Sequence, residues 1–367
     1  MISRRSFVEA SLAGAAVSCG RKPTRLDGYA YVANQDGNTI AVVDLAAFAV
    51  TRYIRLDASP TAIISHPKRP FIYVLTPKTG TLHEIDVNSL AVVRKVEAAR
   101  SALSMRMDPA ATAIWVLSSE ARKLVRVPFD SFRPEAQIQL PYEPVDFDLS
   151  ERSLAGISYG PAGSIGLVHL PTQTLERPVR VADRVGSVAF RSGGDALLVA
   201  NTSGRMLSLY QAPGSRIITH LPLAVRPDYF CFNQDGGQMF ITGEGMDAVV
   251  IVYPHHVPQV AETALAGRAP GAMGVSTDFL FVANPMTGDV AVFKIDSRKL
   301  VAIAAVGSEP SFIAVTRNNR FALVLNRKSG DMAVIRIDAV KPSRNRSVGL
   351  FTMIPVGSRP VCAVIRS

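Results

Sequence analysis

Residues 281–296 read FVANPMTGDVAVFKID, two apolar runs joined by a polar turn that contains Gly288. Neither run shows the 3.6-residue period of an amphipathic helix, and both are nearly continuous in apolar residues, which is typical of strands covered on two faces. A glycine in the connecting turn fits a backbone position with positive φ. This stretch therefore predicts a tight antiparallel hairpin.

The first of these runs recurs throughout the chain after residue 28, always near the same spacing. Its copies are Tyr31–Asn34, Tyr73–Thr76, Trp115–Ser118, Ile157–Gly160, Leu198–Asn201, Phe240–Gly243, Phe281–Asn284 and Leu323–Asn326. Consecutive copies are 41 or 42 residues apart. A constant period of this length is the signature of a repeat architecture.

Each unit contains the same four apolar or alternating runs, separated by turns rich in Gly, Pro, Asn and Asp. Four short strands per repeat are typical of a propeller blade. Every one of the four strand types can be counted eight times. We therefore predict an all-β fold, a β-propeller of eight four-stranded blades over residues 29–367, with seven blades and an irregular extension as the alternative.

The two ends of the repeat array complement each other. The first unit starts at Tyr29 with its second strand, and the chain ends on VGSRPVCAV (356–364), an innermost strand that no further blade follows. A closed ring removes the exposed edges of a repeat array. We therefore expect the C-terminal strand to complete the first blade.

The run YVAN leading into NTIAVVDL, followed by a proline and an apolar strand that closes on HPKRPFIYV, resembles the YVTN-type β-propeller repeat. The resemblance covers residues 29–367, and the tryptophan-aspartate signature of another large propeller family is missing. Similar propellers include lactonase-type hydrolases and eight-bladed proteins that hold a d-type haem. The resemblance thus implies a hydrolase or a haem carrier as alternatives to a binding module.

The N-terminus, MISRRSFVEASLAGAAVSCG, has paired arginines followed by a short, weakly apolar run. The run is too short to span a bilayer and is typical of an export signal. Ser3 to Phe7 resembles the twin-arginine motif, and Ala16 to Cys19 resembles a lipoprotein cleavage box. We expect an export signal at 1–19 with lipidation of Cys19, a linker at 20–28, and a periplasmic or envelope location with only a lipid anchor in the membrane. The alternative is cleavage nearby, with Cys19 discarded.

The chain has a formal net charge of +10, but its basic residues are scattered. No run of five basic residues occurs, so we expect no nucleic-acid partner. We expect a monomer whose partner is an anionic small molecule or an envelope protein. Cys231 and Cys362 lie in apolar runs and are expected to be small buried side chains, although a disulfide between them stays possible.

The turns that lead into the innermost strands should share one rim with the turns that follow the YVAN-type runs. The residues just before the proline position are Ser59, Arg100, Glu143, Arg184, Arg226, Ala269, Glu309 and Arg359, and Arg268 lies one place before Ala269. Guanidinium groups bind carboxylates and phosphates in bidentate pairs. The sequence therefore predicts an anion site formed by Arg100, Arg184, Arg226, Arg268 and Arg359. The alternative is that these are solvated turns whose arginines pair with Glu143, Glu309 or Asp183.

Catalytic motifs are few. The six histidines are His66, His83, His169, His220, His255 and His256, and none has the spacing of a metal site. Neither a nucleophile elbow nor a phosphate loop occurs. No Glu, His and Arg set matches the lactonase-type enzymes, no axial histidine is expected at the arginine-rich rim, and the Cys-x-x-Cys-His attachment motif is absent. The sequence favours a binding module without a metal or catalytic site, and leaves an enzyme or haem protein as the alternative.

Overall fold

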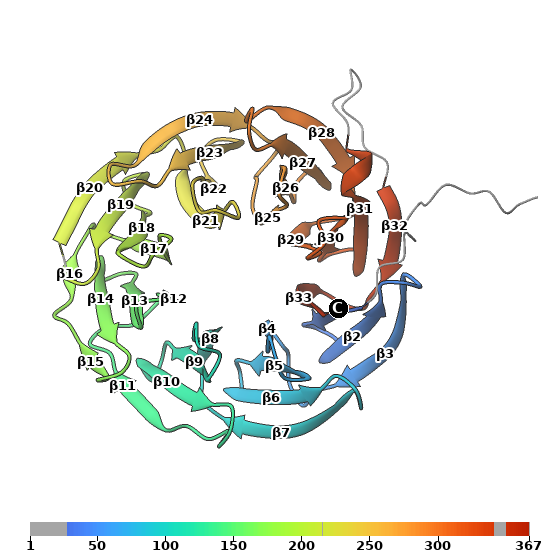
Figure 1. Ribbon diagram of the computed structural model, residues 1–367, viewed down its shortest axis with the longest axis horizontal. Coiled ribbons are helices and arrows are strands. Elements are labelled where there is room, and N and C mark those ends of the chain that lie inside the picture. The colour runs from blue at the N-terminus through green and yellow to red at the C-terminus, as the bar shows by residue number, and fades with distance from the viewer. Residues whose placement is uncertain (1–27, 215, 341–349, 367) are drawn as a thin grey trace, which may run out of the picture.

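Eight antiparallel sheets stand around a central axis as the blades of a β-propeller (Figure 1). The structure is a computed structural model that describes residues 28–214, 216–340 and 350–366. We number the blades 1 to 8 in chain order. The prediction of eight blades is confirmed, and the seven-bladed alternative is excluded.

From the axis outward, blade 1 consists of β33 (Pro360–Arg366), β1 (Tyr29–Asn34), β2 (Thr39–Asp44) and β3 (Ala49–Arg55). Blade 2 has β4 (Ala62–Ser65), β5 (Phe71–Thr76), β6 (Thr81–Asp86) and β7 (Ala91–Glu97). Blade 3 has β8 (Ala102–Met107), β9 (Ala113–Ser118), β10 (Lys123–Pro128) and β11 (Ala136–Gln139). Blade 4 has β12 (Asp146–Leu149), β13 (Leu154–Tyr159), β14 (Ser164–His169) and an outer strand split into β15 (Thr174–Leu175) and β16 (Val179–Arg180).

Blade 5 has β17 (Val185–Phe190), β18 (Ala196–Asn201), β19 (Met206–Gln211) and β20 (Arg216–Pro222). Blade 6 has β21 (Arg226–Phe232), β22 (Met239–Glu244), β23 (Ala248–Tyr253) and β24 (Gln259–Leu265). Blade 7 has β25 (Met273–Val275), β26 (Phe279–Asn284), β27 (Asp289–Lys294) and β28 (Leu300–Ala305). Blade 8 has β29 (Pro310–Val315), β30 (Phe321–Asn326), β31 (Asp331–Arg336) and β32 (Leu350–Pro355). Within these residues the only helical element is the 3-10 turn η1 (Ile337–Ala339), so none of the described helices could cross a membrane.

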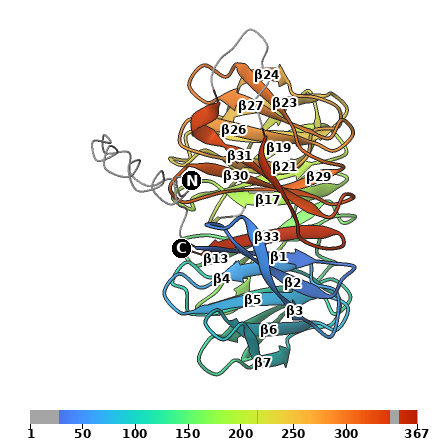
Figure 2. The same ribbon diagram turned by 90° about the vertical axis from the view of Figure 1, so that its right-hand side faces the viewer.

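The ring is closed by the last strand, as expected from the two chain ends. Strand β33 pairs antiparallel with β1, with Tyr29 opposite Arg366 and Asn34 opposite Pro360. Figures 1 and 2 show the red C-terminal strand lying against the blue first blade. The closure joins segments more than 320 residues apart in the chain, such as the Asn34 side chain and the Val356 carbonyl.

The burial pattern explains why the repeated runs are continuously apolar. Strands β9, β13, β18 and β30 are buried at every position, because a blade packs against a neighbour on each face. The outer strand β20 instead alternates between exposed and half-buried residues along its whole length. Position within the blade therefore decides the sequence pattern.

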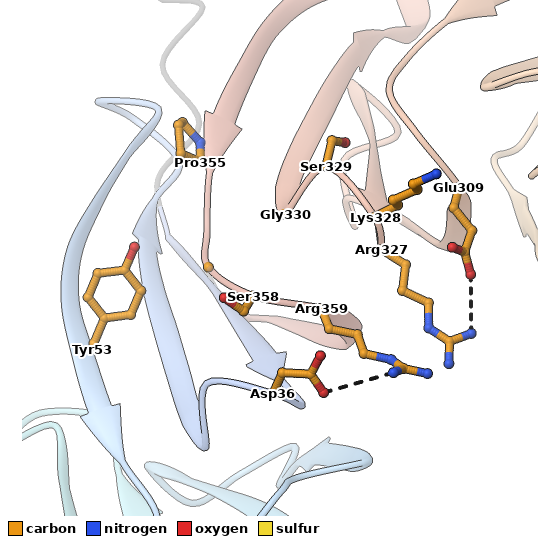
Figure 3. Close-up of a pocket in the computed structure, with 11 residues that line it drawn as sticks. Asp36, Tyr53, Glu309, Arg327, Lys328, Ser329, Gly330, Pro355, Ser358 and Arg359 are labelled. Atoms are coloured by element: carbon orange, nitrogen blue, oxygen red, sulfur yellow. Dashed lines mark ion pairs between the residues drawn. The ribbon is translucent and has the colours of Figure 1, made fainter.

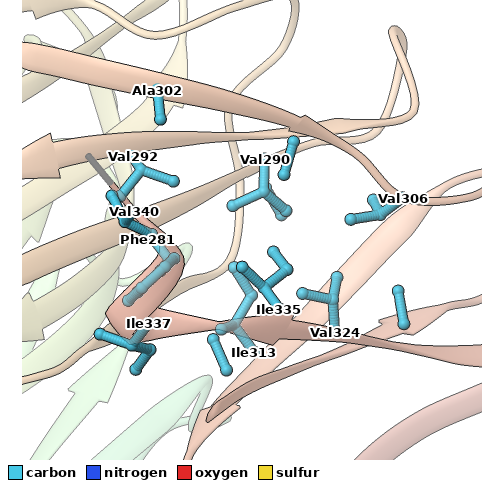
Figure 4. Close-up of a cluster of buried hydrophobic side chains, with 14 of the residues drawn as sticks. Phe281, Val290, Val292, Ala302, Val306, Ile313, Val324, Ile335, Ile337 and Val340 are labelled. Atoms are coloured by element: carbon cyan, nitrogen blue, oxygen red, sulfur yellow. The ribbon is translucent and has the colours of Figure 1, made fainter. Parts of the chain in front are cut away.

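The hydrophobic core is divided into eight clusters, one at each boundary between neighbouring blades. Figure 4 shows the cluster between blades 7 and 8, where Phe281, Val290 and Val292 pack opposite side chains that include Ile313 and Ile335. Each of these clusters joins two neighbouring blades, as in other repeat proteins. Closure by β33 is therefore needed to cover the cluster between blades 8 and 1.

Candidate functional site

The turns that lead into the innermost strands and the turns that follow the YVAN-type runs lie at the same end of the blades. The main-chain N–H of Gln35 donates to the Arg359 carbonyl at 2.9 Å, and that of Arg327 donates to the Glu309 carbonyl at 2.9 Å. The same bond joins Thr202 to Arg184 and Ser119 to Ser101. In these four blades the turn before the innermost strand is therefore tied to the turn after the second strand, and the two kinds of turn lie on one rim.

Strand register shows which of the predicted arginines are equivalent. Arg184, Arg226 and Arg359 each directly precede the residue that pairs with the last residue of the YVAN-type run, which is Asn201, Gly243 and Asn34 respectively. Ser101 occupies this place in blade 3, so Arg100 lies one residue earlier, as does Arg268 before Ala269. Three of the five predicted arginines therefore share one structural position.

The five arginines differ in their ion pairs. Arg226 Nη1 contacts Glu244 Oε2 at 2.7 Å, and Arg100 Nε contacts Glu97 Oε1 at 3.0 Å. Arg359 Nη1 lies 4.0 Å from Asp36 Oδ1. Arg184 and Arg268 are exposed and have no ion pair within 4.0 Å among the residues that the structure describes. The alternative prediction was that the rim arginines form ion pairs with Glu143, Glu309 or Asp183. Arg226 and Arg100 do form close ion pairs, but with Glu244 and Glu97.

Arg359 lines a hollow of about 640 Å³ between blades 8 and 1, which we call the rim pocket (Figure 3). Its lining residues are Asp36, Tyr53, Glu309, Arg327, Lys328, Ser329, Gly330, Pro355, Gly357, Ser358 and Arg359. Figure 3 shows the side chains of Arg327 and Arg359 extending toward the same region. Two arginines and a lysine from two blades therefore line one hollow.

The carboxylates of the rim pocket form only long ion pairs with these cations. Arg327 Nη1 lies 3.5 Å from Glu309 Oε1, and the Arg359 to Asp36 separation is 4.0 Å. Charge-assisted hydrogen bonds are usually about 2.7–2.9 Å long. Across the described part of the chain, neither guanidinium makes a side-chain hydrogen bond and Lys328 has no ion pair. The rim pocket thus combines three cations with two loosely placed carboxylates.

The backbone around the rim pocket is locked in place. The N–H groups of Val356 and Gly357 donate to the Gly330 carbonyl at 3.0 and 3.1 Å. Gly357 has φ +125°, and a Cβ there would lie 2.7 Å from Asn34 Nδ2, which donates to the Val356 carbonyl. The close approach of the Asn34 side chain to Gly357 therefore explains both residues. The hydrogen bonds to Gly330 fix the turn that carries Lys328 to the turn that carries Arg359.

Arg327 and Lys328 were not among the predicted site residues, although the sequence contains a signal for them. The two residues after the YVAN-type runs are Gln35-Asp36, Pro77-Lys78, Ser119-Glu120, Pro161-Ala162, Thr202-Ser203, Glu244-Gly245, Pro285-Met286 and Arg327-Lys328. Only the last pair is wholly basic. A comparison of both turn types, rather than of one, could have identified the rim pocket.

The innermost strand of blade 4 carries two half-buried acids that sequence reasoning also missed. Asp146 and Asp148 on β12 accept hydrogen bonds from the Val188 and Phe190 N–H groups of the next blade, at 3.1 and 2.8 Å. Burial raises the pKa of both carboxyls, although Arg106, whose Nη2 lies 3.7 Å from Asp146 Oδ1, opposes the shift. The alternating aspartates of VDFDL were the signal, because they lie on one face of a strand.

Histidine and cysteine side chains do not gather near the axis as a metal site would require. None of the six histidines lies on an innermost strand, and His66, in the turn after β4, accepts hydrogen bonds from the Lys68 and Arg69 N–H groups at 3.0 Å. Cys231 and Cys362 are free thiols on β21 and β33, and burial raises the pKa of each to about 12. Among residues 28–214, 216–340 and 350–366, no group of three or more His, Cys, Asp and Glu side chains could hold a metal ion.

Comparisons with known proteins support the fold alone. No protein-family model matches the chain, and no curated protein matches it significantly. Among solved structures, the dihydro-haem d1 dehydrogenase NirN in complex with DHE is similar with a TM-score of 0.77 at 11% identity, over 94% of this chain and 77% of that one. Apo AztD from Citrobacter koseri is similar with a TM-score of 0.68 at 13% identity, over 92% and 97% of the two chains. The chain is thus a β-propeller, and its membership of the YVTN-type family stays a prediction.

Proposed function

We propose that the propeller is a ligand-binding module and that its rim pocket takes an anionic small molecule bearing a carboxylate or phosphate. The observation that supports this most directly is that Arg327, Lys328 and Arg359 line one hollow, in which the Glu309 and Asp36 carboxylates lie 3.5 and 4.0 Å from the Arg327 and Arg359 guanidinium groups. A bound anion would complete hydrogen bonds that the protein leaves unmade. Guanidinium groups favour planar oxyanions because they donate in bidentate pairs.

The locked backbone supports binding rather than a merely solvated turn. The two turns that present the cations are hydrogen-bonded to each other through Gly330, so little chain ordering would accompany ligand binding. The hollow has the volume of a typical small-molecule site. The proposal therefore narrows the predicted arginine-rich mouth to one boundary between two blades.

Similarity to NirN, whose name refers to haem d1, raises the haem carrier as a second candidate. The residues present do not fit a histidine-ligated haem, since no histidine lies on the innermost strand of any blade. The buried Asp146 and Asp148 carboxyls would also oppose the negative charges of haem carboxylates on that part of the ring. For the lactonase-type hydrolase, the described residues provide no metal cluster.

We also propose that the chain is exported and that Cys19 is lipidated, on the basis of the twin-arginine and cleavage-box motifs. These motifs and the predicted linker at 20–28 fall on residues 1–27, outside the described part of the chain. Envelope fractionation of the full chain and of Cys19→Ser tests this proposal. Release of the variant from the membrane fraction is expected, and an unchanged distribution would contradict lipidation.

Calorimetric titration of the full chain with succinate and pyrophosphate tests the rim pocket. We expect one saturable site for at least one of these anions. The double variant Arg327→Gln with Arg359→Gln should weaken binding by about tenfold or more, since a hydrogen bond to a charged group is worth about 1.5–3 kcal/mol. Arg226→Gln is the matched control, because Arg226 lies on the same rim but pairs closely with Glu244. Equal losses in both variants, or no binding of either anion, would contradict the proposal.

A further inference from the structure

A second hollow of the same construction lies one blade away from the rim pocket. It has a volume of about 890 Å³, lies between blades 7 and 8, and is lined by Pro285, Met286, Thr287, Gly288, Ala305, Val306, Gly307, Ser308, Glu309, Lys328, Leu350 and Met353. We call it the apolar hollow. Its segment Val306 to Glu309 corresponds to Val356 to Arg359 of the rim pocket, because both are the VGS segments that lead into an innermost strand.

The two hollows share a backbone but differ in their side chains. A Cβ on Gly288 would lie 2.8 Å from the Gly307 carbonyl oxygen, and one on Gly330 would lie 2.8 Å from the Gly357 carbonyl oxygen. Pro285-Met286 stands where the rim pocket has Arg327-Lys328. The same repeated geometry thus presents an apolar surface at one blade boundary and a cationic surface at the next.

Two apolar side chains of this hollow are exposed to solvent. Met286 is 69% exposed and Met353 is 41% exposed. Exposed apolar side chains that line a hollow are typical of binding sites, and methionine adapts to ligands of varied shape.

The apolar hollow and the rim pocket adjoin each other at the end of blade 8. Glu309 and Lys328 line both of them. Lys328 therefore stands at the junction, with the guanidinium groups of Arg327 and Arg359 on one side and Met286 on the other. A molecule with a charged group and an apolar chain matches this order of surfaces.

We infer that the ligand is an amphipathic anion, whose charged group binds in the rim pocket and whose unbranched apolar chain lies in the apolar hollow. This inference rests on the proposed function and adds the apolar half of the ligand. Burial of each methylene group strengthens binding by up to roughly fourfold. Affinity should therefore rise with chain length while the rim-pocket cations stay necessary.

Titration of the full chain with acetate, hexanoate and decanoate, each below its micelle concentration, tests the inference. We expect affinity to rise by about tenfold or more from hexanoate to decanoate, and decyltrimethylammonium to bind far more weakly than decanoate. The double variant Met286→Ser with Met353→Ser should remove the dependence on chain length and leave succinate or pyrophosphate binding unchanged. Met246→Ser is the matched control, since Met246 is 43% exposed and belongs to blade 6 rather than to either hollow.

The outcomes separate the inference from the proposed function. Succinate or pyrophosphate binding without any effect of chain length, or a decanoate affinity that the methionine variant does not change, overturns the inference alone. Absence of binding for every anion overturns both. Binding to phosphatidylglycerol vesicles without binding of soluble decanoate overturns the inference in favour of a membrane surface.

Discussion

Arginine and carboxylate groups meet in two contrasting ways in this propeller, at the boundary between blades 2 and 3 and at the rim pocket. Glu84 is 1% exposed, accepts a hydrogen bond from the Tyr73 hydroxyl at 2.9 Å, and is gripped by Arg94 through Nε and Nη2 at 2.5 and 2.7 Å. Arg94 also donates to the Phe129 and Asp130 carbonyls of blade 3. The Tyr73 hydroxyl, the Glu84 carboxylate and the Arg94 guanidinium therefore all form hydrogen bonds within the fold.

The rim pocket contains the same chemical groups at 3.5 and 4.0 Å, half-exposed to solvent. Closely paired charges that are buried hold neighbouring blades together, because removal of one partner leaves the other desolvated and unpaired. Loosely paired charges at a surface add little stability and keep their donors available. The comparison teaches that the same residue types stabilise the ring at one place and are suited to bind a ligand at another.

Loss of ring closure should have the largest effect. Deletion of residues 357–367 removes β33, exposes the inner edge of β1 and opens the cluster between blades 8 and 1. We expect loss of the cooperative unfolding transition, measured by circular dichroism during heating. A circular permutant that places 356–367 directly before Gly28 is the control and should unfold cooperatively, because Arg366 and Tyr29 are antiparallel partners and Ser367-Gly28 supplies a two-residue hairpin loop. A deletion variant as stable as the full chain would contradict closure by β33.

Glu84→Gln should have the next largest effect. The variant keeps the shape of the side chain but leaves Arg94 without its charged partner, so we expect the free energy of unfolding to fall by roughly 2–3 kcal/mol. Urea unfolding monitored by fluorescence measures this. Glu135→Gln is the control, since Glu135 forms a more exposed pair with Arg126 at 3.1 Å and its loss should cost about 0.5 kcal/mol or less. Equal losses in the two variants would remove the distinction between buried and exposed pairs.

Asp148 shows what desolvation does to a carboxyl that forms no ion pair within 4.0 Å among the described residues. Its Oδ2 accepts the Phe190 N–H at 2.8 Å, and burial raises its pKa. A folded-state pKa above the unfolded value contributes stability that is present below the unfolded pKa and is lost as pH rises through the folded pKa. The contribution of Asp148 to the free energy of unfolding should therefore decrease as pH rises above about 4.

Asp148→Asn should flatten this pH dependence and be at least as stable as the wild type at about pH 8, because an amide oxygen can still accept the N–H. Urea unfolding at about pH 5 and about pH 8 measures the difference. The exposed Asp183→Asn is the control. If the free energies of unfolding of the wild type and of Asp148→Asn change by the same amount between the two pH values, ionisation of Asp148 does not destabilise the fold, and the prediction is wrong.

Most of the architecture could be predicted from the sequence, because the repeat places each strand type at fixed intervals and burial on two faces leaves continuous apolar runs. The ring closure followed from the unmatched strands near Tyr29 and at 360–366. The split of the outer strand of blade 4 into β15 and β16 was not predicted, since an outer strand has one solvated face and little apolar pattern to mark it.

The candidate site was predicted only in part. The shared rim and Arg359 were inferred from the repeat, but Arg327 and Lys328 follow a different strand and become neighbours of Arg359 only across the closure of the ring. Which arginines are neutralised could not be read from the chain, because the partners Glu244 and Glu97 depend on side-chain reach and on strand register. Strand pattern also cannot show that Asp146 and Asp148 point toward the backbone of the next blade.

Thermal unfolding of the wild type, Glu84→Gln and the Arg327→Gln, Arg359→Gln double variant, each with and without succinate or whichever anion binds best, tests the central claim most directly. A ligand that binds the native state raises Tm. We predict that Glu84→Gln has a lower Tm but the same anion-induced rise as the wild type, whereas the double variant keeps the wild-type Tm within about 2 °C and loses the rise. A double variant whose Tm falls as far as that of Glu84→Gln, or that keeps the full rise, would contradict the assignment of stability to the boundary between blades 2 and 3 and of binding to the rim pocket.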